Sequence, residues 1–179
     1  MKGNTAALLD AALRGASESG ADVERLDLVK LDINPCMACH QCDSGNSCRR
    51  HKDDMGVIYK RIREVDAIVL ASPIYFMGVT AQTKAMIDRC QCFWIEKYVD
   101  KIRFYDGKRR PRGLFVSCAG SPKQVVFEPA IHVVKAFFAA IDYQYSGQVL
   151  LGFTDDEALP VRKRSALQEA EVAGKHLCH

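Results

Sequence analysis

Apolar positions along the chain follow two periods, one typical of amphipathic helices and the other typical of buried strands. Helical spacing predicts helices at 5–19, from about 54 onward, at about 80–99, from 129 onward and at 160–177. Near-continuous apolar runs or loose alternation predict strands at 22–31, 66–76, 112–120 and 146–153. Strands that alternate with helices in this way predict a parallel sheet with helices on both faces.

The first residues, "MKGNT", differ from the usual start of such a fold. Thr5 is the expected cap of the first helix, which leaves no room for a strand before it. In a doubly wound sheet the first strand is central, and the loop after it binds phosphate. Either the protein continues upstream of Met1, or another element fills the centre of the sheet. We expect the first, because two central strands without a neighbour would expose their hydrogen-bonding edges.

Length and composition favour one globular domain over residues 1–179, with a cysteine-rich loop at 34–52. Of the 179 residues 48% are apolar and 26% are charged, and the net charge is only +3. No apolar run reaches the length of a membrane span, and the N-terminus lacks the apolar stretch of a signal peptide. We therefore expect a cytoplasmic protein, in which clustered cysteines indicate metal or redox chemistry more often than disulfides.

Four of the eight cysteines follow a C-x2-C-x2-C-x5-C pattern: Cys36, Cys39, Cys42 and Cys48. Iron–sulfur clusters bind four thiolates, and compact C-x2-C-x2-C runs supply three of them in known proteins. The spacing therefore favours a [4Fe–4S] cluster. The alternatives are structural zinc, which usually joins two more distant pairs, a disulfide, and reduced thiols without any ligand. We interpret His40 as a solvent-facing spacer within this loop.

A second group of candidate residues follows the apolar run that ends at Ala71. Ligands of open α/β sheets bind beyond the carboxyl ends of the strands. Ser72 offers a hydroxyl group, and Gly78 would let the backbone approach a flat ligand, which Tyr75 and Phe76 could cover. The alternative is that both aromatic side chains only pack against the core.

Taken together, "KGNTAALLDAAL", "CMACHQCDSGNSC", "KDDM" and "SPIYFMGVTAQTKAMIDR" resemble the iron–sulfur flavoprotein branch of the NADPH-dependent FMN reductase family. The resemblance covers most of residues 2–120 and implies a flavodoxin-like, three-layer α/β/α fold. It implies FMN and a [4Fe–4S] cluster on the four cysteines of the loop. Members of the family usually begin with a strand and Gly-Ser-Pro-Arg, which this chain lacks. The implied FMN-binding residues are Asn4, Thr5, Ser72, Pro73, Ile74, Tyr75, Phe76, Gly78, Cys118, Ala119 and Gly120.

Other chemical motifs are missing from the sequence. It contains no P-loop, no G-x-G-x-x-G fingerprint and no readable Ser/His/Asp set, so cofactors would supply the chemistry. Basic runs at 49–52, 107–112 and 161–164 are most simply solvated faces. Alternatively, they attract an acidic ferredoxin or the 2′-phosphate of NADPH. Because no aromatic residues are interleaved with these charges, we expect no nucleic-acid partner.

The sequence thus predicts a flavoprotein that relays electrons between a donor, either ferredoxin or NAD(P)H, and an acceptor. The family resemblance implies a homodimer or homotetramer. Two alternatives remain: a cluster-free NAD(P)H-dependent FMN or quinone reductase, and a zinc-stabilised binding module without enzymatic activity.

Overall fold

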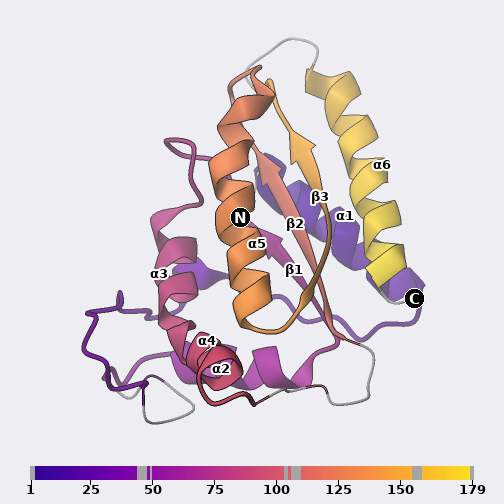
Figure 1. Cartoon of the computed structure of the whole chain (residues 1–179). Helices are drawn as coiled ribbons and strands as arrows, with labels where there is room; N and C mark the ends of the chain where they lie inside the picture. The colour runs from indigo at the N-terminus through magenta and orange to yellow at the C-terminus, as the bar shows by residue number, and fades with distance from the viewer. Residues whose placement is uncertain are drawn as a thin grey trace.

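A parallel sheet lies between two layers of helices (Figure 1). The computed structural model describes residues 3–43, 48, 50–102, 105, 110–154 and 159–177. Within these residues the sheet has the strand order β1-β2-β3, and both strand pairs are parallel. The strands are β1 (Ala67–Ala71), β2 (Arg112–Cys118) and β3 (Gln144–Leu151).

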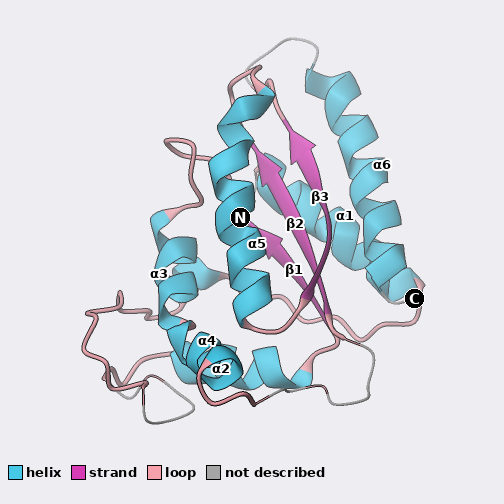
Figure 2. Ribbon diagram, viewed as in Figure 1, coloured by secondary structure: helices cyan, strands magenta, loops and turns pink. Residues whose placement is uncertain are grey.

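Helices α1 (Asn4–Glu18) and α6 (Leu159–Leu177) cover one face of the sheet, and α5 (Glu128–Ala140) covers the other (Figure 2). On the α5 side the core continues into α2 (Met55–Glu64), α3 (Ala81–Arg89) and α4 (Gln91–Tyr98). Two 3₁₀ turns, η1 (Leu28–Lys30) and η2 (Gln124–Phe127), complete the regular structure of the described chain. The expected parallel sheet between helices is confirmed.

Strand β2 shows why the central apolar run folds as it does. Leu114 and Val116 pack among the residues of α1 and α6, whereas Phe115 points into the core on the opposite face. Successive strand side chains point to opposite faces, so a strand covered on both sides is apolar throughout. This is the pattern that predicted the strand.

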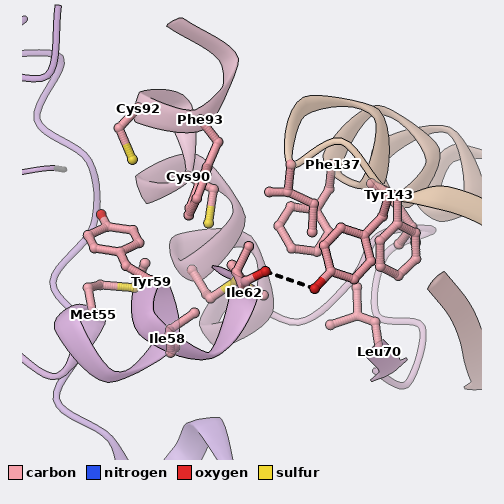
Figure 3. Close-up of a cluster of buried hydrophobic side chains, with 14 of the residues drawn as sticks. Met55, Ile58, Tyr59, Ile62, Leu70, Cys90, Cys92, Phe93, Phe137 and Tyr143 are labelled. Atoms are coloured by element: carbon pink, nitrogen blue, oxygen red, sulfur yellow. Dashed lines mark hydrogen bonds between the residues drawn. The ribbon is translucent and has the colours of Figure 1, made fainter. Parts of the chain in front are cut away.

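The larger core cluster joins α2 to α4 and α5 (Figure 3). Helix α2 buries Met55, Ile58, Tyr59 and Ile62 along one face, as helical spacing requires. The Tyr143 hydroxyl donates to the Ile62 carbonyl at 2.8 Å and lies 2.9 Å from that of Val65. It thereby satisfies backbone acceptors at the end of α2 that the helix itself leaves unpaired.

Three local expectations are wrong. Segment 22–31 is no strand: apart from η1 it has no regular structure. The expected helix at 80–99 is two helices that meet at Cys90. The N-cap of α1 is Gly3 and makes no side-chain cap bond, and the Thr5 hydroxyl instead lies 2.7 Å from Cys118 Sγ.

The failure of the expected strand at 22–31 has a physical cause at the free edge of the sheet. Within the described residues β1 pairs only with β2, and a cavity of about 1400 Å³ borders its other side. Residues 19–29, α1 and β1 all line this cavity. A segment becomes a strand only where a neighbouring strand accepts its hydrogen bonds, and no described strand lies between segment 22–31 and β1.

None of the described helices combines the length and the apolar character that a membrane span requires.

Candidate functional site

The loop from Ser72 to Thr80 leaves the carboxyl end of β1 and leads into α3 (Figure 1). Its first residue, Ser72, is fully buried. The Ser72 hydroxyl accepts the Thr80 N–H at 3.0 Å and donates to the Pro73 carbonyl at 3.1 Å. Ser117 on β2 donates its hydroxyl to the Ser72 carbonyl at 2.7 Å. Ser72 therefore closes the base of the loop, where its hydroxyl faces the protein's own backbone.

The tip of this loop presents aromatic surface to solvent. Tyr75 is 64% exposed, Phe76 is fully exposed and Met77 is 43% exposed. Tyr75 and Gly78 exchange two backbone hydrogen bonds of 3.0 Å, which bring Phe76 and Met77 into the left-handed region at φ 49° and 62°. That conformation is uncommon for side chains larger than glycine and is concentrated at functional sites. Tyr75 and Phe76 do not pack into the core, contrary to the alternative considered from sequence.

The start of α1 lies beside this loop. Asn4, Thr5, Pro73, Tyr75 and Cys118 all line the same large cavity, at the carboxyl ends of β1 and β2. A helix N-terminus leaves amide N–H groups unpaired and carries a partial positive charge, which suits a phosphate. Burial raises the pKa of the Cys118 thiol, and the Thr5 hydroxyl beside it lowers that pKa in part. The thiol is therefore a neutral wall of the cavity.

The other candidate FMN-binding residues of this region, Ile74, Ala119 and Gly120, differ in burial. Ile74 packs against the core, and its N–H donates to the Cys118 carbonyl at 2.9 Å. Ala119 is buried and donates its N–H to the Leu151 carbonyl at 2.9 Å, whereas Gly120 is exposed. The structure thus brings segments 4–5, 72–78 and 118–120 together at the carboxyl ends of the strands. These residues fit a flavin mononucleotide: a helix N-terminus for the phosphate, and exposed aromatic surface for the ring.

The cysteine loop has a hydrogen-bonded stem. Asp32 and Asp54 exchange two bonds: the Asp32 N–H donates to Asp54 Oδ2 at 2.8 Å, and the Asp54 N–H donates to the Asp32 carbonyl at 2.9 Å. Next to them the Asn34 N–H donates to Asp53 Oδ2 at 3.1 Å. These bonds hold the two ends of the loop together, so the cysteines between them belong to one closed segment.

The four thiols of the loop are free and differ in exposure. Cys36 and Cys39 are exposed, whereas Cys42 and Cys48 are half-buried against the core that includes α2 and α3. Ala38 and His40 take left-handed conformations, with φ of 51° and 58°, which lets the chain turn sharply between successive cysteines. The side chain of His40 is exposed and its Nδ1 lies 3.1 Å from Asp43 Oδ2.

The described residues of the cysteine loop do not form a preassembled metal site. In the described part of the chain no three His, Cys, Asp or Glu side chains have the arrangement of a metal site. Burial raises the pKa of Cys42, and the neighbouring Asp43 raises it further. The chemistry of the donor set nonetheless fits an iron–sulfur cluster, since four unpaired thiols lie on one closed loop with no described disulfide among them.

Arg89 connects the cysteine loop to α3. Its side chain is fully buried, as is that of Asp53, and Arg89 Nη1 lies 2.6 Å from Asp53 Oδ2. Burial alone would raise the pKa of Asp53, but the Arg89 guanidinium and the amides of Asn34 and Met55 keep it below its usual value. Arg89 Nε donates to Cys48 Sγ at 3.2 Å. This pair could not be predicted from the sequence, because Asp53 and Arg89 are far apart in the chain and no local pattern joins them.

Two cysteines outside the loop, Cys90 and Cys92, belong to the core. Cys90 and Cys92 are both buried, and burial raises the pKa of Cys92 to about 12, with Glu96 as a further cause. Both side chains lie in the core cluster that faces α5.

Comparison with known proteins identifies the family. The family model described as NADPH-dependent FMN reductase matches residues 1–149, which is most of the chain. The chain belongs to the NADPH-dependent FMN reductase family. An iron-sulfur flavoprotein of Archaeoglobus fulgidus is 41% identical over 114 residues, which cover 61% of this chain and 51% of that protein. An iron-sulfur flavoprotein of Methanocaldococcus jannaschii is 40% identical over 88 residues, which cover 49% and 45%.

This FMN reductase family member thus spans about half the length of the curated relatives it matches. Among solved structures, an NAD(P)H:quinone oxidoreductase from Methanothermobacter marburgensis matches with a TM-score of 0.68 and 18% identity. The match covers 99% of this chain and 92% of that one. At this level of identity the likeness shows the fold alone, and it confirms the flavodoxin-like architecture.

Proposed function

We propose that the chain is a flavin-dependent oxidoreductase that carries FMN and a [4Fe–4S] cluster on a single domain. It would relay electrons between a reduced donor, either NAD(P)H or ferredoxin, and an acceptor. One observation supports the pairing above all: α3 begins at the loop proposed to hold FMN and ends at Arg89, which contacts a cysteine of the other site. Nine helical residues span only about 13 Å.

The flavin assignment is supported by the family and by the cavity. Asn4 and Thr5, with the free amides of the first turn of α1, would bind the phosphate. The backbone of 73–78 and the side chains of Tyr75 and Phe76 would contact the ring. Ser72, Ser117 and Thr80 would keep this loop in place through the hydrogen bonds described above. The family implies NAD(P)H as the electron donor.

The cluster assignment is supported by the four free thiols and by the relatives named as iron-sulfur flavoproteins. Cys36, Cys39, Cys42 and Cys48 would be the ligands. A bound flavin accepts a hydride and releases electrons singly, and an iron–sulfur cluster carries one electron at a time. The protein's part is to fix the cysteines, exclude water with the half-buried Cys42 and Cys48, and orient the flavin.

A visible spectrum of anaerobically purified protein tests the proposal. Flavin bands together with a broad shoulder at about 400 nm are the expected result for thiolate-bound iron beside FMN. Cys39→Ser should remove the shoulder and leave the flavin bound. His40→Asn is the matched control, because it alters the same exposed loop, tolerates the left-handed backbone and removes only an imidazole. Loss of flavin in Cys39→Ser contradicts the assignment of two separate sites, and loss of iron in His40→Asn as well contradicts the assignment of Cys39 as a specific iron ligand.

A second candidate is a cluster-free NAD(P)H-dependent flavin reductase. The observation that favours it is that no three ligating side chains converge among the described residues. Flavin bands without iron in the wild-type protein would establish this candidate. A colourless protein that contains zinc would contradict both candidates and favour a binding module.

A further inference from the structure

Arg89 makes a contact that its ion pair does not require. The guanidinium Nη1 and Nη2 atoms both bind Asp53, at 2.6 and 3.2 Å. Nη1 also donates to the Asn34 carbonyl at 2.8 Å. The remaining nitrogen, Nε, faces the sulfur of Cys48 at 3.2 Å. Because the guanidinium is planar and its donors are fixed relative to one another, the Asp53 and Asn34 bonds determine where Nε points.

Burial keeps the Arg89 guanidinium in place beside the Cys48 sulfur. The side chains of Arg89 and Asp53 are 0% and 1% exposed. A charge in such a place remains only when it is paired and hydrogen-bonded, and Asp53 is held in turn by the amides of Asn34 and Met55. Tyr59 closes the site from α2, since its hydroxyl donates to the Arg89 carbonyl at 2.8 Å. Arg89 therefore has little freedom to leave the sulfur.

We propose that Arg89 is the positioning residue of the cysteine site: it fixes Cys48 against the end of α3 and raises the reduction potential of the iron–sulfur group by donating to its sulfur. This inference rests on the proposed function. The physical reason is that reduction adds negative charge to the cluster and its sulfurs, so a donated N–H stabilises the reduced form more than the oxidised form. Hydrogen bonds to the sulfurs are one of the determinants of such potentials.

The same contact fixes the geometry between the two sites. The N-cap of α3 is Thr80, whose N–H donates to the Ser72 hydroxyl in the proposed flavin loop. The helix ends at Arg89, which holds both the stem of the cysteine loop, through Asp53 and Asn34, and Cys48 itself. Figure 1 shows the loop after β1 and the cysteine loop near opposite ends of α3. A single short helix thus sets the separation of the two sites.

An electron-paramagnetic-resonance redox titration of anaerobically purified protein tests the role of Arg89. Arg89→Lys keeps the positive charge but replaces the planar guanidinium by a single ammonium group. The ammonium cannot donate to Asp53, Asn34 and Cys48 at the same time. The double variant Asp53→Asn with Arg89→Gln keeps the pair neutral overall and leaves an amide oxygen for the Asn34 N–H. Arg63→Lys is the control, because Arg63 pairs with the buried Glu96 at 2.6 Å and the change weakens a comparable ion pair elsewhere.

In both Arg89 variants the potential of the iron–sulfur signal should move to a more negative value, while the FMN potential in the same sample stays unchanged. Arg63→Lys should leave both potentials unchanged. Loss of iron from both Arg89 variants, with flavin bound and the control intact, supports the fixing of Cys48. An unchanged iron–sulfur potential, or an equal shift in Arg63→Lys, overturns the role of Arg89 alone. Absence of iron from the wild-type protein overturns the proposed function itself and this inference with it.

Discussion

Replacing Gly174 by alanine probes the close contact between α6 and α1. A Cβ atom at Gly174 of α6 would lie 2.0 Å from the Ala12 carbonyl oxygen of α1, and one at Gly15 would lie 2.0 Å from the Glu171 carbonyl oxygen. The two glycines thus let the backbones of α1 and α6 approach each other closely at two reciprocal points. Because each obstacle is backbone rather than a flexible side chain, the helices must separate to admit a methyl group.

The expected cost follows from that separation. Real Cβ atoms essentially never approach another atom within 3.0 Å, so α1 and α6 must move apart by roughly 1 Å. Overpacking of this kind costs about 1–3 kcal/mol, and a backbone obstacle places Gly174→Ala at the upper end. The higher helix propensity of alanine returns about 1 kcal/mol. We therefore expect a net loss of about 2 kcal/mol in the free energy of unfolding.

Gly56→Ala is the matched control. Gly56 lies in α2, and a Cβ atom there would meet nothing within 4 Å. This variant should gain up to about 1 kcal/mol from propensity alone. Urea unfolding followed by far-ultraviolet circular dichroism measures both variants. Gly15→Ala combined with Gly174→Ala should cost less than the sum of the two, because one separation accommodates both methyl groups. Equal stability of Gly174→Ala and Gly56→Ala would refute the close crossing.

Three further predictions concern the contacts that hold the two loops and the core. Tyr143→Phe should lower the free energy of unfolding by about 1–2 kcal/mol, since it removes the hydroxyl near the Ile62 and Val65 carbonyls; an unchanged urea midpoint would contradict this. Ser117→Ala removes the bond to the Ser72 carbonyl and should weaken FMN binding severalfold in a fluorescence titration, whereas intact affinity would show that the loop needs no such support. Because the pKa of Asp53 is lowered in the folded state, its contribution to stability is present above the usual carboxyl pKa near 4 and is lost as the pH falls below it. Asp53→Asn should therefore show a shallower loss of stability below about pH 4 than the wild-type protein, and parallel curves would contradict the assignment.

The elements that were predicted correctly are those whose pattern depends on burial alone. β2 is covered on both faces, so its apolar run identified it without knowledge of its partners. α2 shows the same for helices, because Met55, Ile58 and Ile62 lie on one face of any helix with that sequence. In both cases the local pattern and the tertiary environment agree.

The elements that were predicted wrongly depend on distant neighbours. Segment 22–31 has a strand-like alternation, but β1 offers its free edge to a cavity and not to this segment. The break at Cys90 directly follows Arg89, whose side chain is held by Asp53 and Asn34 from a distant part of the chain. Propensity carries no information on either circumstance, because tertiary packing decides both.

The candidate site shows the same division. The cysteine spacing and the run from Ser72 to Gly78 are local signals, and they led directly to the two loops. Arg89 carries no local signal, although it contacts both the stem and Cys48. The two candidate loops could thus be located from the sequence, whereas Arg89, which holds one of them, could be found only in the structure.

The content of iron, acid-labile sulfide and FMN in the anaerobically purified wild-type protein tests directly whether both redox groups share this chain. We expect about four iron atoms and about four sulfides for each FMN, the composition of one [4Fe–4S] cluster. FMN at full occupancy with neither iron nor sulfide would contradict this expectation.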